Sequence, residues 1–101
     1  MAVERPEGYC YKSDFRKMTG LGYDAIDVGL CQAPKQYTPR GYLYDVRAGL
    51  VALLRHCERM EREARAKQAA CRRAGSVTYE RIADGWGKKA ERIRGMMEDR
   101  G

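Results

Sequence analysis

Apolar residues in the middle of the chain recur at intervals of 4, 3, 4, 3, 4 and 7 residues. They are Val46, Leu50, Leu53, Cys57, Met60, Ala64 and Cys71. Lys67 occupies the position where one more apolar residue would complete the series. On a helix, this spacing places the side chains along one narrow stripe. The pattern predicts a long helix over residues 46–74 that packs against another helix, in a helical hairpin or in a coiled coil between copies.

A second apolar stripe follows near the C-terminus and predicts a helix over residues 76–99. Its members are Tyr79, Ile82, Trp86, Ala90, Ile93 and Met97. Gly75 separates the two long helices and is a suitable residue to end the first one. Gly85 and Gly87 weaken the second helix by about 1 kcal/mol each relative to alanine. We therefore expect this helix to be packed against a partner or partly frayed.

The N-terminal part has two shorter stretches of helical spacing. The first begins at Lys12 and ends at Gly20, with Phe15 and Met18 three residues apart. The second covers Tyr23–Leu30, where apolar side chains again fall at helical spacing. Two short helices joined by a glycine-containing turn are typical of a helix-turn-helix.

A hairpin is predicted within residues 33–45. Pro39–Gly41 has turn composition and is flanked by aromatic and β-branched residues. A hairpin after a helix-turn-helix is called a wing, and Lys35 and Arg40 are expected near its tip. Asp45 is in position to cap the long helix. The predicted fold is thus mainly α, with an irregular lead-in at residues 1–8 and a winged helix-turn-helix head at residues 9–45 before the two long helices.

The chain is basic, with 20 Lys and Arg against 14 Asp and Glu and a net charge of +6. Most of the excess lies in residues 55–101, which hold thirteen basic and eight acidic residues. Such a balance favours a polyanionic partner. Over residues 55–65, however, Arg and Glu alternate, which favours salt bridges along a helix over a phosphate-binding track.

The second short helix is an unusual DNA-reading helix, because it carries Asp24 and Asp27 and no Lys or Arg. We therefore assign candidate DNA contacts to the first helix and to the hairpin. These candidates are Lys12, Arg16, Lys17, Lys35, Gln36 and Arg40. The tyrosines at 37, 42 and 44 could stack on bases. Packing the hairpin onto the head is the favoured interpretation for them.

No catalytic constellation is visible, so we expect a protein that is not an enzyme. His56 and Cys57 are adjacent, and on a helix their side chains diverge too far to form a nucleophile–base pair. The four cysteines form no C-x-x-C pair, so neither a metal nor another cofactor is expected. The absence of a long apolar run or an N-terminal apolar segment predicts a soluble, reduced, cytosolic protein without a membrane span.

Two segments resemble the lambda-type small subunit of bacteriophage terminase, the DNA-recognition part of the genome-packaging motor. One runs from Lys12 to Ile26 and continues through Pro34 and the Gly41 hairpin to Tyr44 and Asp45. The other runs from Ala70 through an arginine–glycine turn to Trp86. The order of these motifs is similar to that of the family. The acidic second helix and Val77-Thr78, near which a proline is expected, depart from its pattern.

The resemblance implies a non-catalytic protein in the host-cell cytoplasm that binds the packaging start site in viral DNA. It implies a dimer or ring that delivers this DNA to the large terminase subunit. Self-association is assigned to Val46, Leu50, Leu53, Cys57, Met60 and Ala64. Contact with the large subunit is assigned to Tyr79, Ile82, Trp86 and Ile93. For Trp86, packing against the long helix is the competing interpretation.

Two other classes remain open. The head also resembles excisionase-like and MerR-like winged regulators, which bind DNA without a packaging partner. A small phage interaction protein would need no DNA contact. DNA binding distinguishes the last class from the others, and binding to a large terminase subunit distinguishes packaging from regulation.

Overall fold

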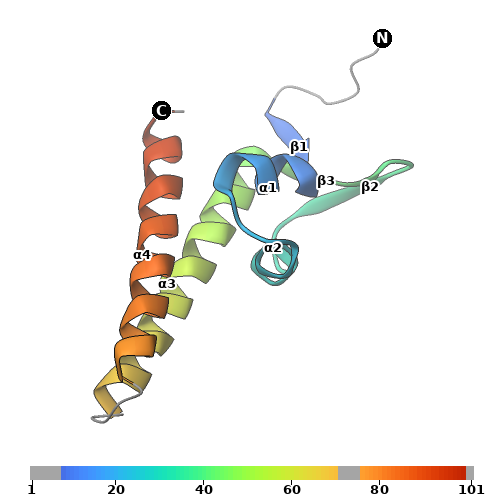
Figure 1. Ribbon diagram of the computed structural model, residues 1–101. Coiled ribbons are helices and arrows are strands. Elements are labelled where there is room, and N and C mark those ends of the chain that lie inside the picture. The colour runs from blue at the N-terminus through green and yellow to red at the C-terminus, as the bar shows by residue number, and fades with distance from the viewer. Residues whose placement is uncertain (1–7, 71–75, 100–101) are drawn as a thin grey trace. The chain divides into compact units, whose positions relative to one another are not determined.

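The computed structural model describes residues 8–70 and 76–99, which form four helices and three short strands (Figure 1). The chain is mainly helical, as expected. It divides between Leu53 and Leu54 into two compact units. The first unit contains β1 (Tyr9–Tyr11), α1 (Lys12–Thr19), α2 (Tyr23–Leu30), β2 (Lys35–Thr38), β3 (Gly41–Asp45) and the start of α3 (Val46–Ala70). The second unit contains the rest of α3 and α4 (Ser76–Asp99).

The two short helices form at the predicted positions. Gly20 ends α1 in the left-handed conformation, with φ of 74°, and its N–H donates to the carbonyl of Arg16 at 2.9 Å. This conformation favours glycine, which has no Cβ to clash with the backbone. Thr19 is buried at this turn, and its hydroxyl forms two hydrogen bonds. It donates to the Phe15 carbonyl and accepts from the Leu21 N–H. The turn between the helices is therefore fixed by local chemistry.

The predicted hairpin is present and belongs to a three-stranded antiparallel sheet with strand order β1-β3-β2. Thr38 fixes its turn by donating to the Gly41 carbonyl at 2.8 Å and accepting from the Arg40 N–H. β1 was not predicted from the sequence. It pairs with β3, so that Cys10 lies opposite Tyr44. The hairpin is thus held by a further strand from the beginning of the described chain.

The first unit has a core of large side chains from both helices and the sheet. Phe15 and Tyr44 are buried and meet edge to face, with ring centroids 6.0 Å apart. Gly49 of α3 faces the Phe15 ring so closely that an added Cβ would lie 2.2 Å from Cζ of Phe15. The other large, fully buried residues of this unit are Leu21, Ile26, Leu30, Leu50 and Leu53. Glycine at position 49 therefore lets the ring pack directly on the α3 backbone.

Asp45 caps α3 as predicted. Its carboxylate accepts hydrogen bonds from the N–H groups of Arg47 at 2.9 Å and Ala48 at 3.4 Å. These are helix-start donors that have no partner within the helix. β3 thus passes into α3 without an intervening loop. The predicted end of the long helix at residues 71–74, with Gly75 after it, lies outside the described residues.

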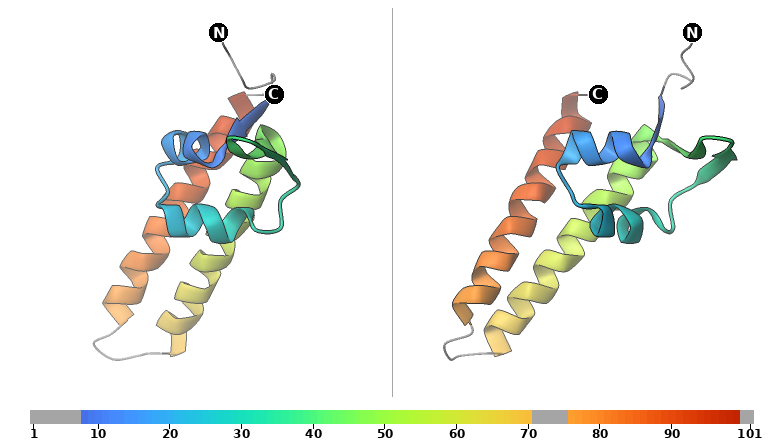
Figure 2. Two further views of the ribbon diagram at one scale, coloured as in Figure 1. Left: turned by 90° about the vertical axis from the view of Figure 1, so that its right-hand side faces the viewer. Right: turned by 45° about the vertical axis from the view of Figure 1, so that its right-hand side comes forward.

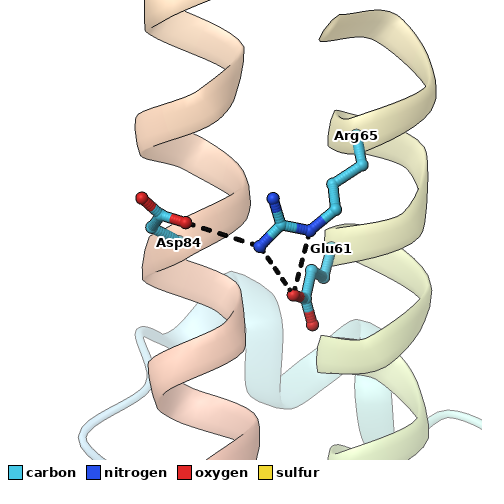
Figure 3. A network of polar contacts seen from close by, with 3 residues as sticks. All are labelled: Glu61, Arg65 and Asp84. Atoms are coloured by element: carbon cyan, nitrogen blue, oxygen red, sulfur yellow. Dashed lines mark hydrogen bonds and ion pairs between the residues drawn. The ribbon is translucent and has the colours of Figure 1, made fainter. Parts of the chain in front are cut away.

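In the second unit, α4 runs antiparallel to the C-terminal part of α3 (Figure 2). Arg94 donates to Glu58 at 2.6 Å, and Arg65 contacts Glu61 on its own helix at 3.0 Å and Asp84 on α4 at 3.4 Å (Figure 3). The side chains of Cys57, Ala64, Ala83, Ala90 and Ile93 are buried. Three of these five residues are alanines, and small side chains permit close packing of two helices.

Candidate nucleic-acid interface

Two of the three candidate DNA-binding residues on α1 interact with α2. Lys12 forms an ion pair with Asp27 at 2.8 Å, and this hydrogen bond is the main reason that its pKa is raised. The Arg16 guanidinium lies 4.3 Å from the centroid of the Tyr23 ring, within cation–π range. Lys17 is exposed and forms no ion pair with a described residue. To bind a DNA phosphate, Lys12 would therefore have to give up its ion pair with Asp27.

The exposed face of α2 is acidic and partly apolar. Asp24, Asp27, Tyr23 and Val28 are all exposed, and Lys12 offsets the charge of Asp27 alone. A helix with this surface would meet the negative potential of a DNA groove unfavourably. In the first unit, the hairpin is therefore the better candidate for DNA contact.

The hairpin carries Lys35, Gln36 and Arg40, all of which are exposed. The prediction that Lys35 lies near the tip was wrong, because Lys35 pairs with Tyr44 at the base of the hairpin and Arg40 occupies the turn. Lys35 donates to the Cys31 carbonyl at 3.3 Å. The β2–β3 hairpin extends away from α1 and α2 in Figure 1 and in the right-hand view of Figure 2. Its cations are thus carried on a projecting element.

The three hairpin tyrosines differ in exposure. Tyr44 is buried against Phe15, as the packing interpretation requires. Tyr37 is 75% exposed and Tyr42 is 44% exposed, and their rings meet each other at 5.6 Å with an interplanar angle of 70°. Tyr37 therefore does not pack the hairpin onto the core. The strand alternation places all three on one face, but only the tertiary packing determines how far along the hairpin the core extends.

The residues assigned to self-association are largely buried within a single chain. Val46, Leu50, Leu53, Cys57 and Ala64 are buried, and Met60 is half-buried. Burial raises the pKa of the Cys57 thiol to about 11. The stripe is therefore already covered within one chain and does not by itself require a second copy. Cys71, the last residue of the stripe, lies outside the described residues.

The residues assigned to the large-subunit contact have unequal surroundings. Ile93 is buried, whereas Tyr79 and Trp86 are half-buried. Trp86 meets His56 edge to face at 5.5 Å, and the Lys89 ammonium lies 4.6 Å from its ring centroid. Ile82 is 42% exposed, and Ala83 occupies the buried position in its place. Helical spacing is compatible with a buried residue at either position. The orientation of α4 buries Ala83 and leaves Ile82 exposed.

His56 is buried and is held in its neutral form. Arg59 can only donate, so the contact of 3.1 Å between its Nη2 and His56 Nδ1 requires an unprotonated Nδ1. Burial is the main reason that the His56 pKa is lowered; Arg59 lowers it further and Glu63 opposes the shift. This arrangement stabilises the second unit around Trp86.

Residues 8–70 and 76–99 contain no group of three or more His, Cys, Asp or Glu side chains arranged to hold a metal ion. None of the helices in these ranges combines the length and apolar composition needed to cross a bilayer. No family model, curated protein or solved structure matches this chain.

Proposed function

We propose that the chain is a non-catalytic DNA-binding protein whose first unit acts as a winged helix-turn-helix and contacts duplex DNA mainly through the β2–β3 hairpin. The observation that carries this proposal is a projecting hairpin with Lys35, Gln36 and Arg40 exposed. The Lys12–Asp27 ion pair, which joins α1 to α2, and the acidic surface of α2 favour the hairpin as the place of contact.

The biological setting that we propose is viral DNA packaging, with this chain as a small terminase subunit. Its support is the order of sequence motifs: helix-turn-helix, hairpin, capped long helix, arginine–glycine turn and tryptophan-bearing helix. In this role the chain would self-associate and pass the DNA to a large terminase subunit. The second copy of the chain and the large terminase subunit are both part of the proposal. The concrete expectation is a large-terminase reading frame next to the gene, whose product copurifies with this chain.

Salt-dependent DNA binding tests the hairpin directly. Each phosphate contact contributes about 0.9 to the slope of log K against log salt concentration. The double variant Lys35→Ala with Arg40→Ala should therefore lower the magnitude of the slope by up to about 2. The matched control is Arg81→Ala with Lys88→Ala, which removes the same charge from exposed positions of α4 and should change the slope much less.

Three results would count against this proposal. A wild-type chain without salt-sensitive DNA affinity would overturn DNA binding and favour an interaction protein. Equal slopes for the two double variants would show that the hairpin is not at the phosphates. Firm DNA binding without any large-subunit partner would contradict the packaging role and favour an excisionase-like or MerR-like regulator.

A further inference from the structure

The hairpin presents an aromatic surface that the core does not use. Tyr37 of β2 pairs with Tyr42 of β3, so the two side chains share one face of the sheet. Tyr37 is the most exposed of the large hydrophobic residues in the described part of the chain, at 75%. Leaving a ring of this size in water forgoes the stabilisation that its burial would give. Tyr44, one pair nearer the base, is the tyrosine that packs against the core.

The geometry of the pair leaves aromatic surface available. In an edge-to-face contact, the ring that contributes its edge keeps both of its own faces open. The rings of Tyr37 and Tyr42 meet in this way, at 70° and 5.6 Å. A flat ligand can therefore stack on the pair while the contact between the tyrosines holds the platform in place.

Positive charge lies on both sides of this aromatic pair along the hairpin. Lys35 precedes Tyr37 by two residues on the same strand face, and its ammonium lies 5.8 Å from the Tyr42 centroid. Two residues of extended strand span about 7 Å. Arg40 lies in the turn beyond the pair. The order of cation, aromatic pair and cation matches the order of phosphate, base and phosphate along a nucleic-acid strand.

We propose that the Tyr37–Tyr42 pair is a stacking site for one unpaired nucleobase, with Lys35 close to a flanking phosphate. The inference rests on the proposed DNA-binding function and adds to it a preference for DNA that contains an unstacked base. Stacking on tyrosine tolerates any base, because every base has a π face. The hairpin would then recognise an opened position in the DNA and not a base sequence.

The test compares the full chain on two labelled DNAs, a short continuous duplex and the same duplex with one unpaired thymine. Fluorescence anisotropy should show tighter binding to the DNA with the unpaired base. Tyr37→Leu should weaken that binding by about 5- to 150-fold, the range expected when one stacked base is lost. Its affinity for the continuous duplex should stay unchanged, and Tyr37→Phe should keep the preference because it keeps the ring.

Tyr9→Leu is the matched control. Tyr9 is also exposed, at 42%, but it pairs with Asp45 and lies on the opposite face of the sheet. This variant should retain the preference. Thermal unfolding by circular dichroism should give the same midpoint for the Tyr37 and Tyr9 variants as for the wild type, since neither ring belongs to the core.

The inference is overturned if the wild type binds both DNAs equally, or if Tyr37→Leu weakens both equally. In either case duplex binding and the proposed function would stand. If the wild type binds neither DNA, the proposed function itself fails. A different outcome is that Tyr37→Leu loses binding to a protein partner while its affinity for both DNAs stays unchanged. That result would make the Tyr37–Tyr42 pair a peptide-binding site and would likewise reject a nucleobase site.

Discussion

The two units use different kinds of side chain to build their cores. The first unit interlocks large residues, of which the Phe15–Tyr44 ring pair is the centre, and places one ring directly on the α3 backbone at Gly49. The second unit uses small buried residues such as Ala83 and Ala90 between two helices, with ion pairs on the exposed sides. The first core is therefore sensitive to shape, whereas the second depends mainly on close helix approach. A Gly→Ala substitution should therefore lower the free energy of unfolding in the first unit, at Gly49, and raise it in the second, at Gly95.

The largest effect concerns Trp86, the single tryptophan of the chain, which lies in the second unit. Trp86→Ala removes the contact with His56 and should lower the free energy of unfolding by about 2–3 kcal/mol. This is less than the loss of about 3–5 kcal/mol for a fully buried ring, because Trp86 is half-buried. Denaturant unfolding measures the change.

Ile82→Ala is the control for Trp86, since Ile82 is exposed on the same helix and should change stability by less than about 0.5 kcal/mol. An unchanged stability in Trp86→Ala, together with lost binding to a large terminase subunit, would contradict the core role. It would support the docking role assigned from the sequence.

The next effect concerns Gly49 in the first unit. Gly49→Ala places a methyl group against the Phe15 ring, and overpacking of this kind costs about 1–3 kcal/mol. The helix preference of alanine returns up to about 1 kcal/mol, so the net change should still be destabilising. Adding Phe15→Leu should reduce the cost of Gly49→Ala, and a double-mutant cycle measures this coupling. Additive changes would show that the ring and the glycine do not share this contact.

The same change in the second unit should be stabilising. Gly95 is exposed on α4, and an added Cβ would have no neighbour within 4 Å. Gly95→Ala should therefore raise the free energy of unfolding by about 0.5–1 kcal/mol through helix preference alone. Gly85 has the same open surroundings and provides an independent repeat. A loss of stability at either position would remove the contrast between the two units.

The smallest effect is a pH dependence from one side chain of the second unit. The pKa of His56 in the folded chain is below its ordinary value of 6.5, because the ring is buried and lies beside Arg59. As the pH falls through that ordinary value, the unfolded state takes up a proton before the folded state does. The free energy of unfolding should therefore decrease from about pH 7.5 to about pH 5.5.

His56→Asn keeps an acceptor for Arg59 and should have a smaller decrease over the same pH range. Unfolding measured at several pH values compares the two chains. Stability that falls equally in both would assign the pH dependence to other groups. Lys89 and Glu63 surround this site as well, so both are kept unchanged in the comparison.

Local chemistry explains what the sequence predicted well. Three predicted features depend only on residues a few positions apart, and each is present. They are the end of α1 at Gly20, the helix Tyr23–Leu30 and the cap of α3 at Asp45. β1 was missed because three residues are too few for an alternating pattern and its partner β3 is distant in sequence. The Lys12–Asp27 ion pair likewise joins two helices and leaves no local signal.

The site was less predictable than the fold for a related reason. Residue type alone does not separate Tyr37 from Tyr44, or Ile82 from Ala83. Only the depth to which the core reaches into each element decides which of two apolar residues is buried. The candidate cations were identifiable from the sequence, whereas their intramolecular partners, such as Tyr23 for Arg16, were not.

The pairing of β1 with β3 also determines how the first unit can fold. α1, α2 and the β2–β3 hairpin can each form from neighbouring residues, but β1 pairs with β3 only after the intervening helices have turned back. Closing this long loop carries the main entropic cost and should limit the folding rate. A chain that begins at Lys12 would lack β1 and leave β3 with an unpaired edge, and such an edge invites pairing between molecules. β1 thus reduces the open edge on this side of the sheet to its own three residues.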